Sequence, residues 1–237
     1  MTAPDPSRPL AWDTPAAAAA YRNRDMRLAR QLIFPAVLER IGAAPDPGAT
    51  VLDVGCGTGA LALELAERQV WAVQGADPSA HMLDLARADR PHPRVDYRRF
   101  DGRALDWLAD ASVDAAVCCL VYCTDPDDRR LAALTAEIHR VLRPGAPYVL
   151  ADLNPAALGE RFATLRYGEP GTPYAPGAPV PTELRQLDGG CVTTACYFRP
   201  LDAYDALLTA AGFPEPTLKA PAAESGGAPY MVLTTVR

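Results

Sequence analysis

The 237-residue sequence predicts an α/β fold in which helices cover a mostly parallel β-sheet. Two observations support this prediction. From Thr50 onward, short apolar segments alternate with longer segments of helical periodicity, which is the pattern of repeated strand–helix–strand units. A glycine-rich segment at 55–59 joins the first apolar segment directly to the helix that follows it. Right-handed crossovers would place the carboxyl ends of the parallel strands along one edge of the sheet.

Residues 1–44 are expected to form an N-terminal helical cap. Within 13–44, the alanine run at 16–20 favours a helix, and Ala29, Ile33 and Val37 recur on one face. Pro35 is expected to kink this segment or to split it in two, because proline removes a helical hydrogen bond. Segment 43–49 contains two prolines and a glycine, and it is expected to link the cap to the sheet.

Residues 45–152 contain the alternating elements of the predicted core. The apolar segments predict strands at 50–54, 70–76, 94–98, 113–121 and 148–152. The helical segments predict helices at 59–68, 79–88 and 126–142. The last of these helices is expected to end at Arg143-Pro144-Gly145, because proline and glycine stop a helix.

The regular alternation stops after Asp152. Residues 153–199 are expected to form a lid insertion, with a long loop at 166–183 that contains five prolines and a strand at 191–198. Residues 200–237 are expected to rejoin the core as a helix at 201–211 and two closing strands at 215–219 and 230–236.

Composition excludes several classes of protein. The net charge of −6 disfavours binding to nucleic acid, because such surfaces are usually basic. No run of about 18 apolar residues exists, so no membrane span is expected. The first ten residues lack the apolar stretch of a signal peptide, and the six cysteines form no C-x-x-C pair. A cytoplasmic protein with reduced cysteines is therefore expected, either a monomer or a homodimer.

The segment 51–59, Val-Leu-Asp-Val-Gly-Cys-Gly-Thr-Gly, predicts a ligand site at the end of the first strand. Its glycines let the backbone turn tightly and approach a ligand, and free N–H groups at the following helix start face that ligand. Asp77 ends the next strand, where a carboxylate can accept hydrogen bonds from a ribose diol. Asp53 would repel a pyrophosphate, so its position favours a ligand with a cationic amine.

These residues resemble the motifs of class I S-adenosylmethionine-dependent methyltransferases over about residues 45–155. Besides 51–59, the matching motifs are Asp77-Pro78-Ser79 with Met82, Phe100-Asp101-Gly102 and Leu142-Arg143-Pro144-Gly145. The resemblance implies a Rossmann-like, doubly wound sheet of seven strands. The sheet would be mostly parallel, with an antiparallel last strand, and would carry N-terminal helices and a lid insertion.

The resemblance also implies that S-adenosylmethionine is the cofactor. Asp53 and the glycine turn would hold its methionine part, Asp77 its ribose, and Met82 and Asp101 its adenine. The implied cofactor-binding residues are Asp53, Gly55, Cys56, Gly57, Gly59, Asp77, Met82, Asp101, Gly102, Leu120 and Tyr21.

The acceptor site is less well defined by the sequence. A sulfonium methyl group is already reactive, so a general base matters only where the nucleophile must lose a proton. We expect Tyr122, which follows the fourth strand, to be the catalytic residue. The expected substrate-binding residues are Tyr122, Asn154, Tyr197 and Arg199. No metal site is expected, although Asp125, Asp152 and Asn154 leave a magnesium site open as an alternative.

The expected function is methyl transfer to oxygen, nitrogen or carbon of a small organic metabolite. Three motifs of macromolecule-modifying relatives are missing after the fourth strand: a Pro-Pro-aromatic loop, a Pro-Cys nucleophile and a pair of glutamates. The alanine- and proline-rich composition suggests a bacterial enzyme of specialised metabolism. Two alternatives remain at this point: a cyclisation or pericyclic reaction that uses the cofactor without methyl transfer, and a non-catalytic cofactor-binding module.

Overall fold

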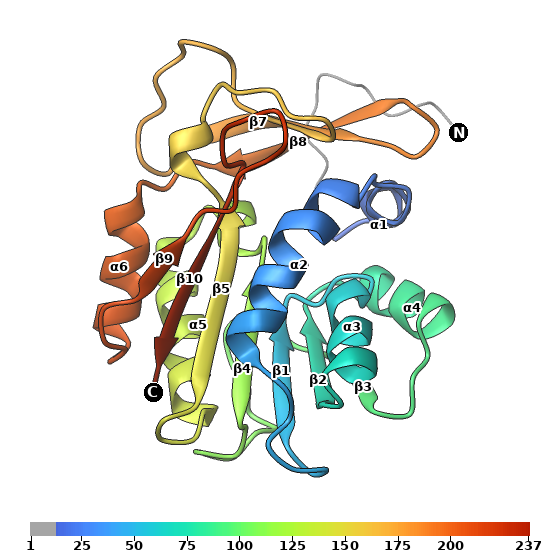
Figure 1. The fold of residues 1–237 in the computed structure, drawn as a ribbon, viewed down its shortest axis with the longest axis vertical. Coiled ribbons are helices and arrows are strands. Elements are labelled where there is room, and N and C mark those ends of the chain that lie inside the picture. The colour runs from blue at the N-terminus through green and yellow to red at the C-terminus, as the bar shows by residue number, and fades with distance from the viewer. Residues whose placement is uncertain (1–12) are drawn as a thin grey trace.

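The computed structural model describes residues 13–237 and is built around a seven-stranded sheet of order β3-β2-β1-β4-β5-β10-β9 (Figure 1). Strands β1 to β5 are parallel, and β10 runs antiparallel to both β5 and β9. The predicted fold is therefore confirmed. The strands are β1 (Thr50–Val54), β2 (Ala72–Asp77), β3 (Val95–Arg99), β4 (Ala115–Cys119), β5 (Pro147–Leu153), β9 (Thr217–Lys219) and β10 (Tyr230–Val236).

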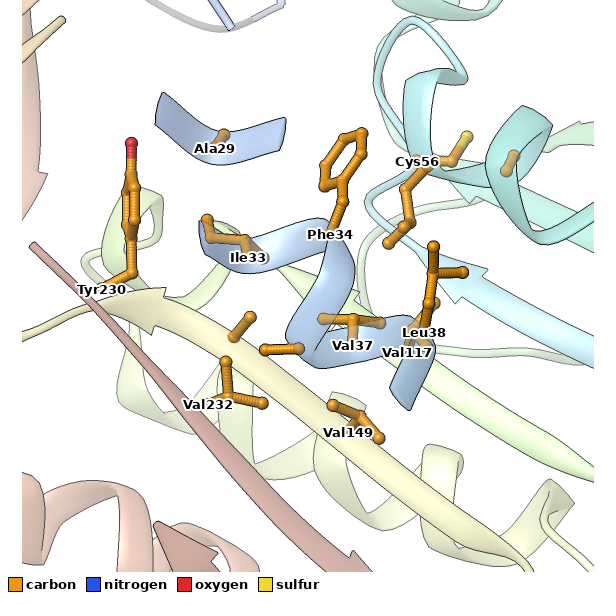
Figure 2. Close-up of a cluster of buried hydrophobic side chains, with 14 of the residues drawn as sticks. Ala29, Ile33, Phe34, Val37, Leu38, Cys56, Val117, Val149, Tyr230 and Val232 are labelled. Carbon is orange, nitrogen blue, oxygen red and sulfur yellow. The ribbon is translucent and has the colours of Figure 1, made fainter. Parts of the chain in front are cut away.

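Helices cover both faces of this sheet because successive strand residues point to opposite sides. Val51 belongs to a buried cluster with residues of α2, α3 and α4, whereas Leu52 belongs to a second cluster with residues of α5 and α6. Figure 2 shows Val37 of α2 beside Val149 of β5. The helices are α1 (Pro15–Arg22), α2 (Arg27–Ile41), α3 (Ala60–Arg68), α4 (Ala80–Asp89), α5 (Asp128–Val141) and α6 (Leu201–Ala210).

The N-terminal helical segment is divided at 23–26 rather than at Pro35. Pro35 lies inside α2, on its exposed side, where water can satisfy the carbonyl group that loses its helical donor. The expectation that Pro35 splits the segment in two is therefore wrong, and the alternative of a kink at Pro35 stays a prediction. Residues 1–12 of the predicted cap lie outside the described residues, and the division of the chain at 44, 152 and 199 stays a prediction.

The order of strands reverses beside β1, which pairs with β2 on one side and with β4 on the other. After β2 and after β4, the chain crosses over the sheet in opposite directions. This leaves a crevice above the carboxyl end of β1. Glycine turn 55–59 and the end of β4 therefore meet at this edge. This is the position at which the sequence predicts the ligand.

A second sheet of three antiparallel strands lies above this edge (Figure 1). It contains β6 (Leu165–Tyr167), β7 (Pro179–Arg185) and β8 (Cys191–Tyr197), so the expectation of a continuous loop over 166–183 is wrong at both ends. Strand β7 tolerates its prolines because Thr182 is its last residue paired with β6. Pro179 and Pro181 lie beyond that pair, where the small sheet needs no N–H group from them: the Gly168 N–H still donates to the Pro181 carbonyl at 3.0 Å, which proline can accept.

The β7–β8 turn is joined to the connection between α1 and α2. The Asp25 N–H donates to the Arg185 carbonyl at 2.8 Å, and the Leu187 N–H donates to the Asn23 carbonyl at 2.8 Å. An antiparallel bridge links Arg24 to Gln186 between them. The small sheet and the N-terminal helices thus close the same end of the molecule. Within residues 13–237, no helix is both long and apolar enough to cross a bilayer.

Candidate active site

The turn between β1 and α3 depends on glycine at two positions. Gly55 has φ +70° and Gly59 has φ +77°, a region that other residues seldom adopt. The N–H groups of Gly55 and Cys56 both donate to the Ala76 carbonyl, at 2.7 and 3.1 Å. These bonds fix the turn against the end of β2 and hold the glycine backbone close to Asp77.

Asp77 joins the glycine turn to the start of α4. One carboxylate oxygen accepts a hydrogen bond from the Gly57 N–H at 2.8 Å, and the other accepts from the Ser79 N–H at 2.9 Å. Burial raises the pKa of Asp77, although these two hydrogen bonds act in the opposite direction. The side chain also lines a cavity, so the same carboxylate that organises the turn is available to a ligand.

Asp53 lies at the end of β1, behind the cavity wall, and its side chain is buried. One of its carboxylate oxygens has no hydrogen-bond partner among residues 13–237. Burial, and to a lesser extent the charge of Asp77, raises the pKa of Asp53 to about 7. A backbone hydrogen bond from Ala62 acts in the opposite direction, but one carboxylate oxygen stays unpartnered. Such a buried carboxylate fits a ligand that brings a positive charge to this end of the cavity.

The raised pKa of Asp53 predicts that stability falls as pH rises. Between pH 3.8, the pKa in the unfolded chain, and about pH 7, the Asp53 carboxyl group is protonated in the folded state and ionised in the unfolded state. Above pH 7 it is ionised in both states, and the buried charge destabilises the folded state. The free energy of unfolding should lose about 1.4 kcal/mol per pH unit across this window. Asp53→Asn should remove this contribution. Urea unfolding at pH 5 and pH 7.5 measures the free energy of unfolding of both proteins. The variant should gain stability relative to wild type as pH rises, and a difference that stays constant contradicts the assignment.

The cavity runs from Asp77 and Met82, past the glycine turn, to the underside of the small sheet, with a volume of about 400 Å³. At its far end, the lining includes Leu165, Leu184 and Thr194 from that sheet. Most of the implied cofactor residues line this cavity. They are Tyr21, Gly55, Gly57, Asp77, Met82, Asp101, Gly102 and Leu120.

Asp101 and Leu120 are placed in the cavity wall by their local backbone. The Asp101 carboxylate accepts hydrogen bonds from the Arg103 and Ala104 N–H groups at 2.8 and 2.9 Å, and these bonds lower its pKa. Leu120 has φ +58°, which ends β4 two residues earlier than the sequence predicts. The Leu120 N–H donates to the Ala151 carbonyl at 2.8 Å, which holds this unusual turn in place.

Several expected site residues do not line the cavity. Cys56 and Gly59 belong to the glycine turn but are not among the residues that line the cavity, and Tyr197 of β8 is not among them either. The Asn154 side chain accepts from the Ala156 N–H at 3.0 Å and donates to the Ala228 carbonyl at 2.8 Å. Asn154 therefore holds two loops together after β5.

Tyr122 lies below the cavity, in the core between the sheet and α5. Its hydroxyl group is 2.7 Å from the Thr135 hydroxyl and 3.2 Å from the Tyr148 hydroxyl, and burial raises its pKa. The short helix 122–124 turns the side chain inward, whereas the sequence suggests that it follows the strand into the cleft. This placement does not agree with direct contact between Tyr122 and an acceptor.

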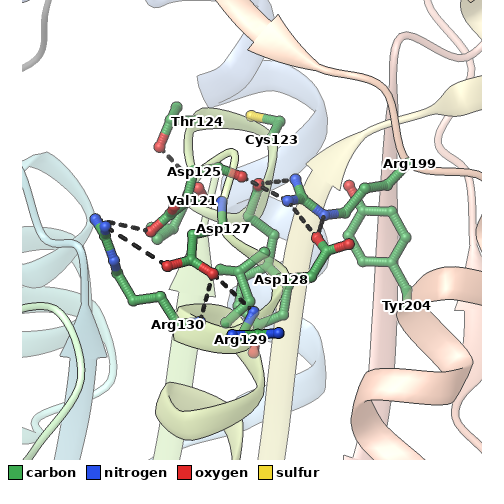
Figure 3. A network of polar contacts seen from close by, with 12 residues as sticks. Val121, Cys123, Thr124, Asp125, Asp127, Asp128, Arg129, Arg130, Arg199 and Tyr204 are labelled. Atoms are coloured by element: carbon green, nitrogen blue, oxygen red, sulfur yellow. Dashed lines mark hydrogen bonds and ion pairs between the residues drawn. The ribbon is translucent and has the colours of Figure 1, made fainter. Parts of the chain in front are cut away.

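Arg199 supports the loop after β4 from the side (Figure 3). Its guanidinium group is buried and donates to the carbonyl groups of Tyr122 and Asp125. It also donates to an Asp128 carboxylate oxygen at 2.8 and 3.1 Å. Residues 123–126 of this loop line the cavity, so Arg199 shapes the wall without lining it.

Arg199→Ala should lower the free energy of unfolding by about 3 kcal/mol, because it leaves buried carbonyl groups without donors. Arg129→Ala is the matched control, because Arg129 is an exposed arginine in the first turn of α5, next to Asp128 (Figure 3). Chemical denaturation measures both variants, and equal stability of the two would contradict the role of Arg199.

The sequence analysis missed the residues that the small sheet contributes to the cavity. All of them lie on the face of the three-stranded sheet that is directed toward the cavity. They are Leu165, Thr182, Leu184, Thr194 and Cys196. Alternation of buried and exposed residues along 180–185 was the available signal, but the prolines at 179 and 181 concealed it. Arg24 also lines the cavity, and no motif in the sequence points to it.

Comparison with known proteins agrees with this geometry. A family model described as "Methyltransferase domain" matches residues 51–145. The N-demethylindolmycin N-methyltransferase of Streptomyces griseus is 34% identical to this chain over 212 residues, which cover 88% of this chain and 89% of the relative. This chain belongs to the class I S-adenosylmethionine-dependent methyltransferases. It is an enzyme that methylates a small molecule, as the sequence predicts, and S-adenosylmethionine is its methyl donor.

Solved structures of this methyltransferase fold support the architecture alone. The CcbJ methyltransferase of Streptomyces caelestis has a TM-score of 0.59 and 21% identity, covering 98% of this chain and 92% of that one. The [4+2]-cyclase SpnF has a TM-score of 0.59 and 20% identity, with coverage of 86% and 79%. The same fold is thus found in proteins named for different reactions, and the acceptor must be inferred from the cavity of this methyltransferase.

Proposed function

We propose that this methyltransferase transfers a methyl group to a nitrogen atom of a small, largely apolar acceptor. The acceptor would lie under the small sheet, against Leu165, Leu184 and Cys196, with its nitrogen directed toward the glycine turn. The proposal is supported by the name of the Streptomyces relative and by the groups that line this end of the cavity.

The observation that carries the proposal is the lack of an unpaired base beside the acceptor, within residues 13–237. The titratable groups that line this end are Tyr21, Arg24, Cys119, Cys123 and Cys196. Asp125, in the loop after β4, also lines the cavity, but its carboxylate is held by the Arg130 guanidinium at 3.4 Å and by the Asp127 N–H at 2.9 Å. Burial raises the pKa of Tyr21 and of the Cys119 thiol, so both are protonated at neutral pH. An acceptor nitrogen that is already unprotonated, as in an aromatic amine, needs no such base.

For the cofactor residues we propose the roles that the family resemblance implies. Asp77 would bind the ribose hydroxyl groups, while Met82 and Asp101 would border the adenine. Asp53, which lies behind the turn and has one unpartnered oxygen, would attract the ammonium group of the methionine part electrostatically. When bound, S-adenosylmethionine supplies a methyl group on a positively charged sulfur.

The protein's contribution to the reaction is position and exclusion of water. Tyr21 covers the glycine turn, since a methyl group added at Gly57 would stand 3.5 Å from its Cε1 atom. Leu120 and Val121 line the wall between the two ends of the cavity, and the small sheet closes it from above. Such an enclosure would hold the acceptor nitrogen in line with the transferred group and keep water out.

The proposal is tested with S-adenosylmethionine that carries a trideuterated methyl group. N-demethylindolmycin, aromatic amines, phenols and carboxylic acids are incubated with the enzyme, and products are analysed by mass spectrometry with fragmentation. We expect a label on nitrogen and S-adenosylhomocysteine as the spent cofactor. Labelled products with the methyl group only on oxygen or carbon would contradict the proposal.

We further infer that the enzyme acts in the cytoplasm. All six cysteines are free thiols, which fits a reducing compartment. A monomer and a homodimer both fit the sequence, and size-exclusion chromatography with light scattering distinguishes the two.

A further inference from the structure

Arg24 is a buried arginine whose backbone is fixed from two sides. It lies between α1 and α2, and its N–H donates to the Tyr21 carbonyl at 3.2 Å. Its bridge to Gln186 joins it to the end of β7. The residue is 6% exposed and lines the cavity. The guanidinium group is therefore held at the inner surface of the enclosure by backbone contacts.

The charge of Arg24 has no carboxylate partner among residues 13–237. Its Nε is buried without a hydrogen-bond acceptor, and none of the ion pairs in this part of the chain includes it. The adjacent Asp25 is occupied by Arg27, at 2.7 Å. The ring of Tyr21, with its centroid 5.6 Å from the Arg24 Cζ, gives a weaker cation–π contact. A buried guanidinium without a counter-charge is costly, so the arrangement suggests an anionic ligand.

A second polar group at the same end of the cavity is also unpartnered. The Thr194 side chain lines the cavity, is 1% exposed, and its hydroxyl group has no hydrogen-bond partner within the described chain. The buried Tyr230 hydroxyl group faces Arg24 and is its hydrogen-bonding neighbour, so it is not counted as unpartnered. A fixed cation and the Thr194 hydroxyl donor are groups that bind a carboxylate.

Arg24 lines the main cavity on the side of the small sheet, and it also lines a smaller cavity beside Thr58 and Ala60 at the start of α3. The ionisable groups that face it are Tyr230, Tyr21, Cys196 and Cys123, which belong to β10, α1, β8 and the loop after β4. Asp53 and Asp77 face Tyr21 instead. Tyr21 therefore stands between the two ends, with Arg24 on the side of the small sheet.

We infer that Arg24 and Thr194 form a subsite for a carboxylate group carried by the acceptor. The inference rests on the proposed function in one respect, namely that this end of the cavity receives the acceptor. The carboxylate would replace the missing counter-charge and would anchor the molecule away from the atom that is methylated. Acceptors with a carboxylate should therefore be selected over their neutral amides.

The test compares carboxylates with isosteric amides by calorimetry, using enzyme saturated with S-adenosylhomocysteine. The probes are anthranilate with anthranilamide, and indole-3-acetate with indole-3-acetamide. Wild type should bind at least one carboxylate about ten- to a hundredfold more tightly than its amide. Arg24→Met should lose this preference. Arg185→Met, which removes an exposed charge from β7 nearby, should keep it.

Thermal unfolding provides a second readout. Arg24→Met should raise the Tm of the ligand-free protein by a few degrees, because it removes an uncompensated buried charge. Thr194→Val, which keeps the shape of the side chain and removes only the hydroxyl group, should reduce the carboxylate preference severalfold. This variant keeps the test decisive if Arg24→Met fails to fold.

Three outcomes would overturn the subsite. The first is a wild-type enzyme that binds neither carboxylate more tightly than its amide. The second is a preference for the carboxylate that persists in Arg24→Met. If Arg24→Met does not fold, persistence of the preference in Thr194→Val counts instead. The third is an Arg24→Met variant that loses affinity for S-adenosylhomocysteine but not for methylthioadenosine, because the carboxylate would then belong to the cofactor. A clear carboxylate preference together with methylation of oxygen would retain the subsite and contradict only the proposed nitrogen acceptor.

Discussion

Asp77→Ala is expected to weaken the binding of S-adenosylhomocysteine at least a hundredfold. The substitution removes the proposed contacts with the ribose hydroxyl groups, and it also removes the acceptor of the Gly57 N–H at 2.8 Å. Two hydrogen bonds to a charged group contribute about 3 kcal/mol or more together, which corresponds to roughly a hundredfold change in affinity. Isothermal titration calorimetry measures the effect directly.

Two comparison variants separate binding from folding. Asp77→Asn keeps one acceptor oxygen for the turn, so it should retain more of the stability than Asp77→Ala while still binding weakly. Asp96→Ala, which removes an exposed carboxylate from β3, should bind S-adenosylhomocysteine as wild type does. Normal affinity in Asp77→Ala would show that the cofactor lies elsewhere.

Gly55→Ala is expected to lower the free energy of unfolding by about 2–4 kcal/mol and to abolish cofactor binding. The φ of +70° alone costs about 1–2 kcal/mol for an L-residue. The added methyl group would also stand 2.2 Å from Cγ2 of Val121, which must move. Because Val121 lines the cavity, this displacement would also disturb the ligand site.

The matched control for Gly55→Ala is Gly145→Ala. Gly145 has φ +80°, but a methyl group there meets no atom within 4 Å. The control therefore carries the backbone cost without the collision, and the difference between the two variants measures the contact with Val121. Chemical denaturation gives both values. Equal destabilisation of the two variants, with cofactor binding intact in Gly55→Ala, would contradict the close approach at this turn.

The parallel sheet could be predicted from the sequence because local signals and tertiary structure agree there. Strand β1 is predicted and observed at Thr50–Val54, and β10 at Tyr230–Val236. Both segments are buried on both faces along most of their length, so apolar residues occupy adjacent positions, and this pattern can be recognised without knowledge of the neighbouring strands. The glycine turn and Asp77 are equally visible, because the backbone geometry requires particular residue types.

The acceptor end of the cavity could not be predicted in the same way. Its residues come from α1, β6, β7 and β8, which approach one another only in the folded chain. Nothing in the local sequence indicates that Arg24 pairs with Gln186 across 162 positions. The sequence predicts Tyr122 in the cleft because it directly follows the expected fourth strand, whereas a short helical turn directs its side chain into the core.

A crystal structure of the enzyme with S-adenosylhomocysteine tests the central claim most directly. We expect density in the cavity, with the ribose on Asp77, the adenine between Met82 and Asp101, and the sulfur directed toward the small sheet. Density at another position, or binding in solution without any density in this cavity, would contradict the account.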